Sequence, residues 1–121
     1  MQKGAETLEP IEVARRAAGI AADKDASDIV MLDIRGVSSF TDYFVICSGQ
    51  TQRQLQAMLD EMDVDLDKEG APVLHREGTV DSGWVLLDFG SVVVHLFSPW
   101  EREYYSLERL WQDGVQVLRI Q

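Results

Sequence analysis

Residues 84–97, which read WVLLDFGSVVVHLF, decide the fold class of this 121-residue chain. Two runs rich in valine and leucine, residues 84–88 and 92–97, flank a short turn that contains Gly90, and this arrangement is typical of a β-hairpin. Because both runs are apolar at nearly every position, both faces of their strands should be covered by other parts of the protein. The stretch therefore predicts two interior strands of a sheet.

Further strands are predicted on both sides of this hairpin. Residues 28–34 and 43–48 are apolar and rich in β-branched side chains, so each should form a strand. Residues 73–76 favour a weaker strand at an edge of the sheet, followed by a turn-rich loop over residues 77–83. Residues 115–118 favour a last strand near the end of the chain. These segments predict a mixed sheet of about five strands.

Three helices are expected to pack on this sheet. The first begins at Pro10, where the missing N–H of proline costs nothing, and four alanines form a small-residue face on it: Ala14, Ala17, Ala18 and Ala21. The second begins at Thr51, which has the spacing of a reciprocal capping box with Gln54, and ends at Gly70. Its apolar stripe contains Leu55, Met58, Leu59, Met62 and Leu66.

The third helix follows Ser98 and Pro99, and it should place four large side chains on one stripe: Trp100, Tyr104, Leu107 and Trp111. Together the helices and strands predict an α/β fold, a mixed sheet of about five strands packed by helices. No linker or repeat divides the chain, so we expect a single domain over residues 9–121 and a flexible tail at residues 1–8.

The charge of the chain narrows the class of partner. Lysine and arginine number 11 against 21 aspartate and glutamate residues, which gives a formal net charge of −10. Since nucleic-acid binding depends on clustered cations, free nucleic acid is not an expected partner. An acidic domain is steered instead toward basic protein surfaces. The acidic run of the second helix is expected to be a solvated face: Asp60, Glu61, Asp63, Asp65, Asp67 and Glu69.

Cysteine content and hydropathy favour a cytoplasmic protein. Cys47 is the only cysteine, so no disulfide can form within the chain. No apolar run approaches the roughly 20 residues that a membrane-spanning helix needs. Residues 1–6 lack the apolar stretch of a signal peptide. We therefore expect a reducing compartment and no membrane association.

Four carboxylates lie at strand ends, those of Asp28, Asp33, Asp42 and Asp88, and the last three are the candidates for magnesium-dependent chemistry. Two-metal catalysis needs carboxylates that converge within about 4 Å of both ions. Alternate positions of one strand would bring carboxylates together, but the Asp-x-Asp pairs of this chain lie at residues 63–67 in a predicted helix, where they diverge.

Other reactive side chains favour structural roles. Cys47 lies in an apolar run, where cysteine usually acts as a small core residue. His75 and His95 belong to different strands and lack the spacing of metal ligands on one element. We therefore expect no catalytic residue, no metal site and no cofactor.

Aromatic side chains gather in the last third of the chain: Trp84, Phe97, Trp100, Tyr104, Tyr105 and Trp111. A small domain rarely has room to bury so many rings. Trp, Tyr and Arg are also the residues that carry most of the binding energy of protein interfaces. Some of these rings are therefore expected to form a surface for a protein partner.

Two blocks of the chain resemble the ribosomal silencing factor family, also called Iojap. The first contains Asp33, residues 42–49 (DYFVICSG) and Arg53-Gln54. The second contains residues 83–90 (GWVLLDFG), residues 93–97 (VVHLF) and residues 102–111 (REYYSLERLW). The resemblance extends from about Ile11 to Asp113. It implies a nucleotidyltransferase-like α/β domain that lacks the metal-binding carboxylate pair.

The resemblance also implies a function without catalysis. Such proteins bind the large ribosomal subunit at ribosomal protein uL-fourteen, block its joining with the small subunit and repress translation in starvation or stationary phase. Transferred to matching positions, the partner-binding residues would be Trp84, Asp88, His95, Phe97, Arg102, Tyr104, Tyr105 and Glu108.

Two other functions stay open from the residues alone. One is a nucleotidyltransferase-like enzyme that uses magnesium at Asp33, Asp42 or Asp88. The other is an acidic interaction module with a different basic partner. Apolar edge strands and surplus aromatic residues also make a homodimer an expectation, through the same surface that docks the partner.

Overall fold

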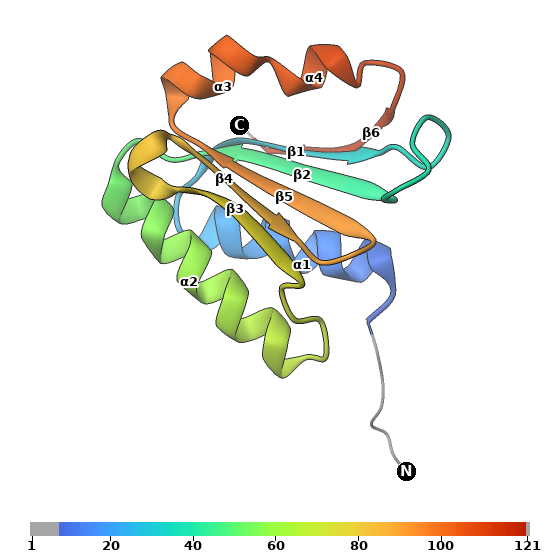
Figure 1. Ribbon diagram of the computed structural model, residues 1–121, viewed down its shortest axis with the longest axis horizontal. Helices are drawn as coiled ribbons and strands as arrows, with labels where there is room; N and C mark the ends of the chain where they lie inside the picture. Colours follow the sequence, from blue (N-terminus) through green and yellow to red (C-terminus); the bar gives the residue numbers. More distant parts are fainter. Residues whose placement is uncertain (1–7, 121) are drawn as a thin grey trace.

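The computed structural model describes residues 8–120. In it, the chain folds into a six-stranded mixed sheet with helices on both faces (Figure 1). The elements in chain order are α1 (Pro10–Asp23), β1 (Ser27–Asp33), β2 (Tyr43–Ser48), α2 (Gln52–Lys68), β3 (His75–Thr79), the short 3₁₀ helix η2 (Val80–Ser82), β4 (Trp84–Asp88), β5 (Val92–Phe97), α3 (Pro99–Tyr105), α4 (Leu107–Leu110) and β6 (Val115–Ile120). The predicted α/β fold with a mixed sheet is confirmed.

The strand order across the sheet is β3-β4-β5-β2-β1-β6. Only β2 and β5 pair in parallel, whereas the other neighbouring strands run antiparallel. The structure confirms the predicted hairpin as β4 and β5, and the strands predicted at residues 28–34 and 43–48 as β1 and β2. It also confirms that the weak strand, β3, lies at an edge of the sheet. The sheet has six strands because residues 115–120 pair with residues 29–33 of β1. β3 also extends to Thr79, so the predicted loop over residues 77–83 is wrong at residues 77–79.

The main core lies between the sheet and the helices α1 and α2, which cover the lower face in Figure 1. The four alanines of the predicted small-residue face of α1 are fully buried, so the helix backbone lies close to the strands as that face predicts. The predicted apolar stripe of α2 is buried as well, and so is Cys47. These residues confirm the core that the helical spacing predicts.

The start of α2 differs from the predicted capping box in one contact. The Thr51 hydroxyl accepts a hydrogen bond from the Gln54 backbone N–H at 3.0 Å, as predicted. The Gln54 side chain accepts from the Gln50 N–H at 2.7 Å instead of the N–H of Thr51. Its amide nitrogen is thereby free to donate to the carbonyls of Lys24 and Asp25 in the α1–β1 loop, at 2.9 and 2.8 Å. Gln54 thus connects two loops as well as capping a helix.

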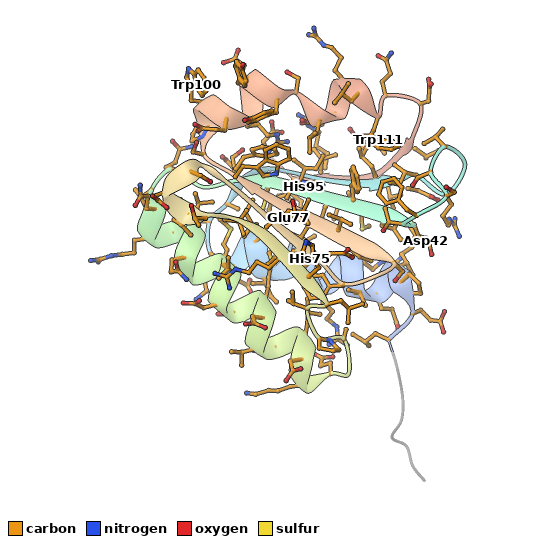
Figure 2. The ribbon with its side chains drawn as sticks, viewed as in Figure 1. Asp42, His75, Glu77, His95, Trp100 and Trp111 are labelled. Carbon is orange, nitrogen blue, oxygen red and sulfur yellow. The ribbon has the colours of Figure 1, made fainter. Side chains whose placement is uncertain are left out.

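The predicted third helix is two short helices, because the chain turns at Ser106. This residue has the left-handed conformation, with φ of 49°, and its hydroxyl donates to the Glu103 carbonyl at 2.6 Å. The predicted stripe is therefore wrong: Leu107 is buried, whereas Trp100 and Tyr104 are 65% and 66% exposed. Trp100 and Trp111 lie at opposite ends of the α3–α4 layer (Figure 2).

The predicted tail at residues 1–8 lies outside the described residues except for Leu8, which packs partly buried against the main core. Between residues 8 and 120, every helix is too short or too polar to cross a bilayer.

Candidate protein-binding surface

The face of the sheet opposite α1 and α2 is covered only in part. α3 and α4 together are short, and they leave β3 and much of β4 uncovered on this side (Figure 1). Along β4, Val85 and Leu87 are buried in the main core, while Trp84, Leu86 and Asp88 are partly exposed on the other side. The expectation that both faces of β4 are covered is therefore wrong. We call this uncovered region, formed by Trp84, Leu86 and Asp88 of β4 and the adjacent strand β3, the open face.

The strand register arranges the open face in three rows. Trp84 lies between Thr79 of β3 and Phe97 of β5, and Leu86 lies between Glu77 and His95. The third row places Asp88 between His75 and Val93. Since side chains alternate between the two faces of a strand, all of these residues point to the same side of the sheet.

Trp84 is at the centre of an aromatic cluster. Its ring stacks on Phe97 with centroids 5.0 Å apart, and it contacts the Tyr105 ring from the end of α3 at 4.4 Å. Its indole N–H donates to His95 Nδ1 at 3.2 Å. Phe97 is 0% exposed, so it supports Trp84 from beneath and presents no surface of its own. Tyr105 is 42% exposed and belongs to the accessible part of the cluster.

His95 lies beneath this cluster and is 3% exposed. Because an indole nitrogen only donates, Nδ1 of His95 must accept, which assigns the neutral imidazole proton to Nε2. Burial lowers the pKa of His95 to about 3, so the ring is neutral around neutral pH. The Phe44 ring packs against it at 4.7 Å, edge to face. His95 therefore positions Trp84 and carries no charge for a partner.

Two hollows flank Trp84, and Glu77, Trp84 and Leu86 line both of them. The Tyr105 hollow, of about 260 Å³, is lined by Glu77, Gly78, Ser82, Trp84, Leu86 and Tyr105. The His95 hollow, of about 350 Å³, is lined by Phe40, Phe44, His75, Glu77, Trp84, Leu86, Asp88, Val93, His95, Leu107 and Trp111. Figure 2 shows His75, Glu77 and His95 along this side of the sheet, with Trp111 at the far end of α4.

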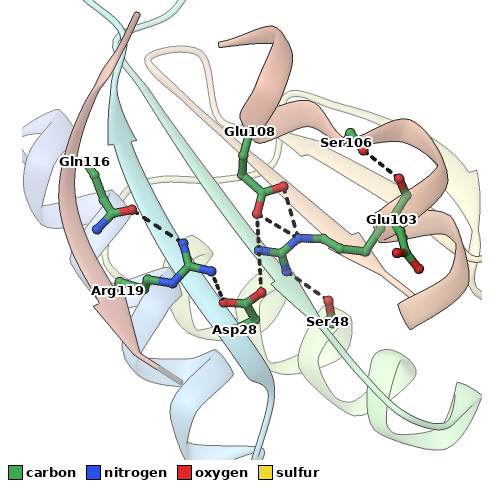
Figure 3. A network of polar contacts seen from close by, with 8 residues as sticks. Asp28, Ser48, Glu103, Ser106, Glu108, Gln116 and Arg119 are labelled. Atoms are coloured by element: carbon green, nitrogen blue, oxygen red, sulfur yellow. Dashed lines mark hydrogen bonds and ion pairs between the residues drawn. The ribbon is translucent and has the colours of Figure 1, made fainter. Parts of the chain in front are cut away.

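Arg102, which is buried, and Glu108, which is partly exposed, form a clamp at the α3–α4 layer. Arg102 is buried and binds Glu108 through Nε and Nη2, with Nη2 2.6 Å from Oε2 (Figure 3). It also donates to the Ser48 hydroxyl at 2.9 Å and lies 3.6 Å from Asp28, which in turn binds Arg119. The clamp ties α3 and α4 to the ends of β1, β2 and β6.

The pKa of Glu108 reflects this environment. Partial burial would raise the pKa of its carboxyl group, but the hydrogen bonds and charge of Arg102 outweigh burial and hold the pKa below the ordinary value. Glu108 therefore stays ionised as the partner of Arg102.

The remaining predicted site residues lie at the borders of the open face. Asp88 lines the His95 hollow, and its Oδ1 accepts from the Gly90 N–H at 2.7 Å, which fixes the turn between β4 and β5. Tyr104 lies on the outer side of α3, stacked on Trp100 with centroids 4.9 Å apart. Of the eight predicted residues, the structure thus brings Trp84, Asp88 and Tyr105 to the open face and places His95 and Phe97 beneath it.

Several lining residues of the hollows were absent from the predicted set: Phe40, Phe44, His75, Glu77, Leu86, Leu107 and Trp111. Leu86 could have been found, because it alternates with Trp84 and Asp88 along one strand. Glu77 lay in a segment that composition assigned to a loop. Phe40 and Phe44 reach the site only through the pairing of β2 with β5, which local patterns do not reveal.

Two of the three candidate carboxylates for catalysis, those of Asp33 and Asp88, lie on strands that are not neighbours. Asp33 ends β1 and Asp88 ends β4, and β2 and β5 separate these strands, which corresponds to roughly 14 Å at the usual strand spacing. Asp33 is paired with Arg35, whose hydrogen bonds lower the pKa of its carboxyl group. Within residues 8–120, no three His, Cys, Asp or Glu side chains are grouped as metal ligands would be. Burial raises the pKa of Cys47 to about 12, so its thiol is protonated.

Comparison with known protein families gives one match over nearly the whole chain. A family model described as "Ribosomal silencing factor during starvation" matches residues 7–121. A ribosomal silencing factor of Bacillus subtilis is 46% identical over 98 residues, covering 81% of this chain and 83% of that protein. A mouse protein named "Mitochondrial assembly of ribosomal large subunit protein 1" is 41% identical over 91 residues, covering 73% of this chain and 40% of that longer protein.

Solved structures agree with the fold. A crystal structure of a Chromobacterium violaceum protein superposes with a TM-score of 0.82 at 32% identity, covering 87% of this chain and 88% of that one. A crystal structure of a Bacillus halodurans protein superposes with a TM-score of 0.73 at 37% identity, covering 89% and 95%.

Proposed function

The chain belongs to the ribosomal silencing factor family, and from this premise we propose that it binds the large ribosomal subunit and sterically blocks joining with the small subunit. The docking partner is ribosomal protein uL-fourteen, on the side of the large subunit that meets the small one. Such binding represses translation in the cytoplasm when nutrients are short. The name of the mouse relative, which refers to the large ribosomal subunit, supports this choice of subunit.

The observation that carries the proposal is the open face around Trp84. It presents the Trp84 ring, which is already held in place by stacking on Phe97 and by the hydrogen bond to His95, and the Tyr105 ring that packs against it. Rings that are fixed before binding lose little conformational freedom on docking, so more of their contact energy stabilises the complex. Aromatic residues in partly desolvated hollows are the usual centres of binding energy in protein interfaces.

The charge of the protein supports a protein target on a ribosome. A net charge of −10 favours a basic protein surface and disfavours the RNA phosphates around it. Occupying one face of a subunit is enough to prevent joining. The proposal therefore needs no catalytic residue, metal or cofactor.

Sedimentation with ribosomal particles tests the function. The purified protein is expected to co-sediment with isolated large subunits, and to be absent from isolated small subunits and from joined ribosomes. In a light-scattering assay it should slow the joining of mixed subunits. Equal binding to joined ribosomes, or no effect on joining, would contradict the proposal.

Alanine substitutions test the open face. Trp84→Ala and Tyr105→Ala should each weaken binding to large subunits by about 2 kcal/mol or more if these rings are centres of binding energy. Val64→Ala, which truncates an exposed apolar residue of α2 across the sheet, is the control and should leave affinity unchanged. Because Trp84 is half-buried, thermal denaturation of each variant must accompany the binding measurement. If folded Tyr105→Ala binds like the wild type, the open face is not the docking surface.

A further inference from the structure

We propose that the Tyr105 hollow is a binding site for an arginine side chain of the docking partner, with the guanidinium against the Trp84 and Tyr105 rings and Glu77 as its counter-ion. The proposal deepens the proposed function, since that function identifies the partner. The site itself is inferred from the chemistry of its lining, which includes two aromatic rings and one carboxylate and no lysine, arginine or histidine.

The two rings provide the surface on which a planar cation can lie. Trp84 and Tyr105 have centroids 4.4 Å apart and planes tilted by 45°, and both line the hollow. A cation over such rings is attracted by their negative faces, most strongly at tryptophan. Since Phe97 and His95 hold Trp84 from beneath, the ring does not have to be ordered when the cation arrives.

Glu77 provides the charge that an arginine needs. It projects from β3 in the register position opposite Leu86, and its side chain is 66% exposed. His75 Nε2 lies 2.7 Å from Glu77 Oε2, which orients the carboxylate and leaves Oε1 for a second donor. A guanidinium can approach such a carboxylate with more than one N–H and remain in contact with an aromatic face.

Other occupants fit this hollow less well. A phosphate would be repelled by Glu77 and would find no cation in the lining. An apolar side chain would remove Glu77 from water without replacing its hydrogen bonds, which is costly. A lysine ammonium could meet Glu77, but it is compact and strongly hydrated, whereas guanidinium is planar and stacks on aromatic rings. The proposal therefore commits to arginine.

A direct titration tests the site without any ribosomal component. N-acetylarginine amide is added to isotope-labelled protein, and the Trp84 indole N–H and the Gly78 amide are followed by NMR. Saturable shifts at roughly millimolar affinity are expected. The neutral isostere Nα-acetylcitrulline amide should give no saturable shift. Nα-acetyllysine amide, whose side-chain ammonium is free, should bind several-fold more weakly than the arginine derivative. Equal shifts with the citrulline derivative, or no saturable shift with the arginine derivative, would overturn the proposal.

Glu77→Gln is the decisive variant, since it keeps the size of the exposed side chain and removes its charge. It should weaken arginine-amide binding about tenfold. Asp63→Asn removes the same charge from the outer side of α2 and should leave the titration unchanged. Tyr105→Phe should retain binding while Tyr105→Leu loses it. If Glu77→Gln binds the arginine derivative like the wild type, the counter-ion is wrongly assigned and the proposal fails.

Sedimentation with large subunits separates this proposal from the proposed function. If the wild type binds subunits, Glu77→Gln should bind about fivefold or more weakly and with a smaller dependence on salt. Wild-type binding together with unchanged Glu77→Gln binding would overturn the arginine site and leave the function standing. If the wild type itself does not bind subunits, the proposed function fails, and the titration still decides whether the hollow takes arginine.

Discussion

At the level of single residues, the open face divides side chains that can touch a partner from side chains that hold them. Trp84 and Tyr105 are accessible, whereas Phe97 and His95 lie beneath them. The sequence does not distinguish accessible from supporting side chains, so the family resemblance assigned all four of these residues to the predicted partner-binding set. The structure separates them because β5 is buried along its whole length, while β4 is covered on one side only.

His95 makes the stability of the protein depend on pH. Burial lowers its pKa to about 3 in the folded state, from 6.5 as the ordinary value. Between these values the unfolded chain binds a proton that the folded protein does not, so the free energy of unfolding falls as pH falls below the unfolded pKa. Between about pH 7 and about pH 5, His95 should account for a loss of about 2 kcal/mol.

His95→Asn is the matched variant for this prediction. Asparagine can still accept from the Trp84 indole N–H, since its oxygen takes the place of Nδ1, but it does not titrate in this range. His75, Glu77 and Asp88 line the same hollow in both proteins, so their contributions cancel in the comparison. Denaturant unfolding of both proteins at several pH values measures the difference. Parallel stability curves would show that His95 is not buried as a neutral ring.

At the level of elements, the predicted segments are those whose pattern is local. The hairpin, the first two helices and the strands at residues 28–34 and 43–48 carry their signals in their own residues, namely apolar runs, a first-position proline and a capping threonine. The predicted third helix is interrupted at Ser106, which has a left-handed conformation. A serine at this position gives no sequence signal for that conformation. The strands predicted at residues 73–76 and 115–118 are present as β3 and β6, but their bounds differ. Both are polar or exposed, so the hydrogen bonds that a neighbouring strand offers set their extent more than their own residues do.

The clamp around Arg102 is another feature that single elements do not reveal. It joins Ser48, Asp28, Glu108 and Arg119, which come from segments far apart in the sequence (Figure 3). Because the clamp fixes α3, it also fixes Tyr105, the last residue of that helix. Arg102 therefore contributes to the open face as a support, although it presents little surface of its own.

Gln54 offers a test of how α2 is joined to the rest of the fold. Its side chain accepts from the Gln50 N–H and donates to the Lys24 and Asp25 carbonyls. Gln54→Ala removes all three bonds and should lower the free energy of unfolding by about 2 kcal/mol. Gln56→Ala on the same helix removes one exposed bond, to Asp60, and should cost less than about 0.5 kcal/mol.

Denaturant unfolding of the two glutamine variants measures this difference directly. Gln54→Glu is a useful third protein, since it keeps an acceptor for the Gln50 N–H and loses both donors to the α1–β1 loop. It should be destabilised as well. If Gln54→Ala and Gln56→Ala have equal stability, the connection between the two loops contributes little to the fold.

At the level of the whole molecule, the acidic run of α2 and the aromatic rings of the open face occupy opposite sides of the sheet. The outer side of α2 carries the exposed carboxylates of Asp60, Asp63 and Asp67, whereas the open face lies beyond the strands on the other side. Contacts at the open face should determine how long a complex lasts. Charge on the far side acts only at long range, so it should affect how fast the protein arrives and in which orientation.

Neutralising the outer side of α2 separates these two contributions. Replacing Asp60, Asp63 and Asp67 by asparagine changes the net charge from −10 to −7 without touching the open face. The association rate with large subunits should fall severalfold at about 0.05 M salt and match that of the wild type near about 0.5 M, where screening is nearly complete. The dissociation rate of the triple variant should equal that of the wild type at both salt concentrations.

Tyr105→Ala should have the opposite effect on the two rates, because loss of a buried contact speeds dissociation and leaves long-range attraction intact. A faster dissociation of the triple variant would mean that the outer side of α2 itself lies in the interface, and the open face would then have to share the docking role.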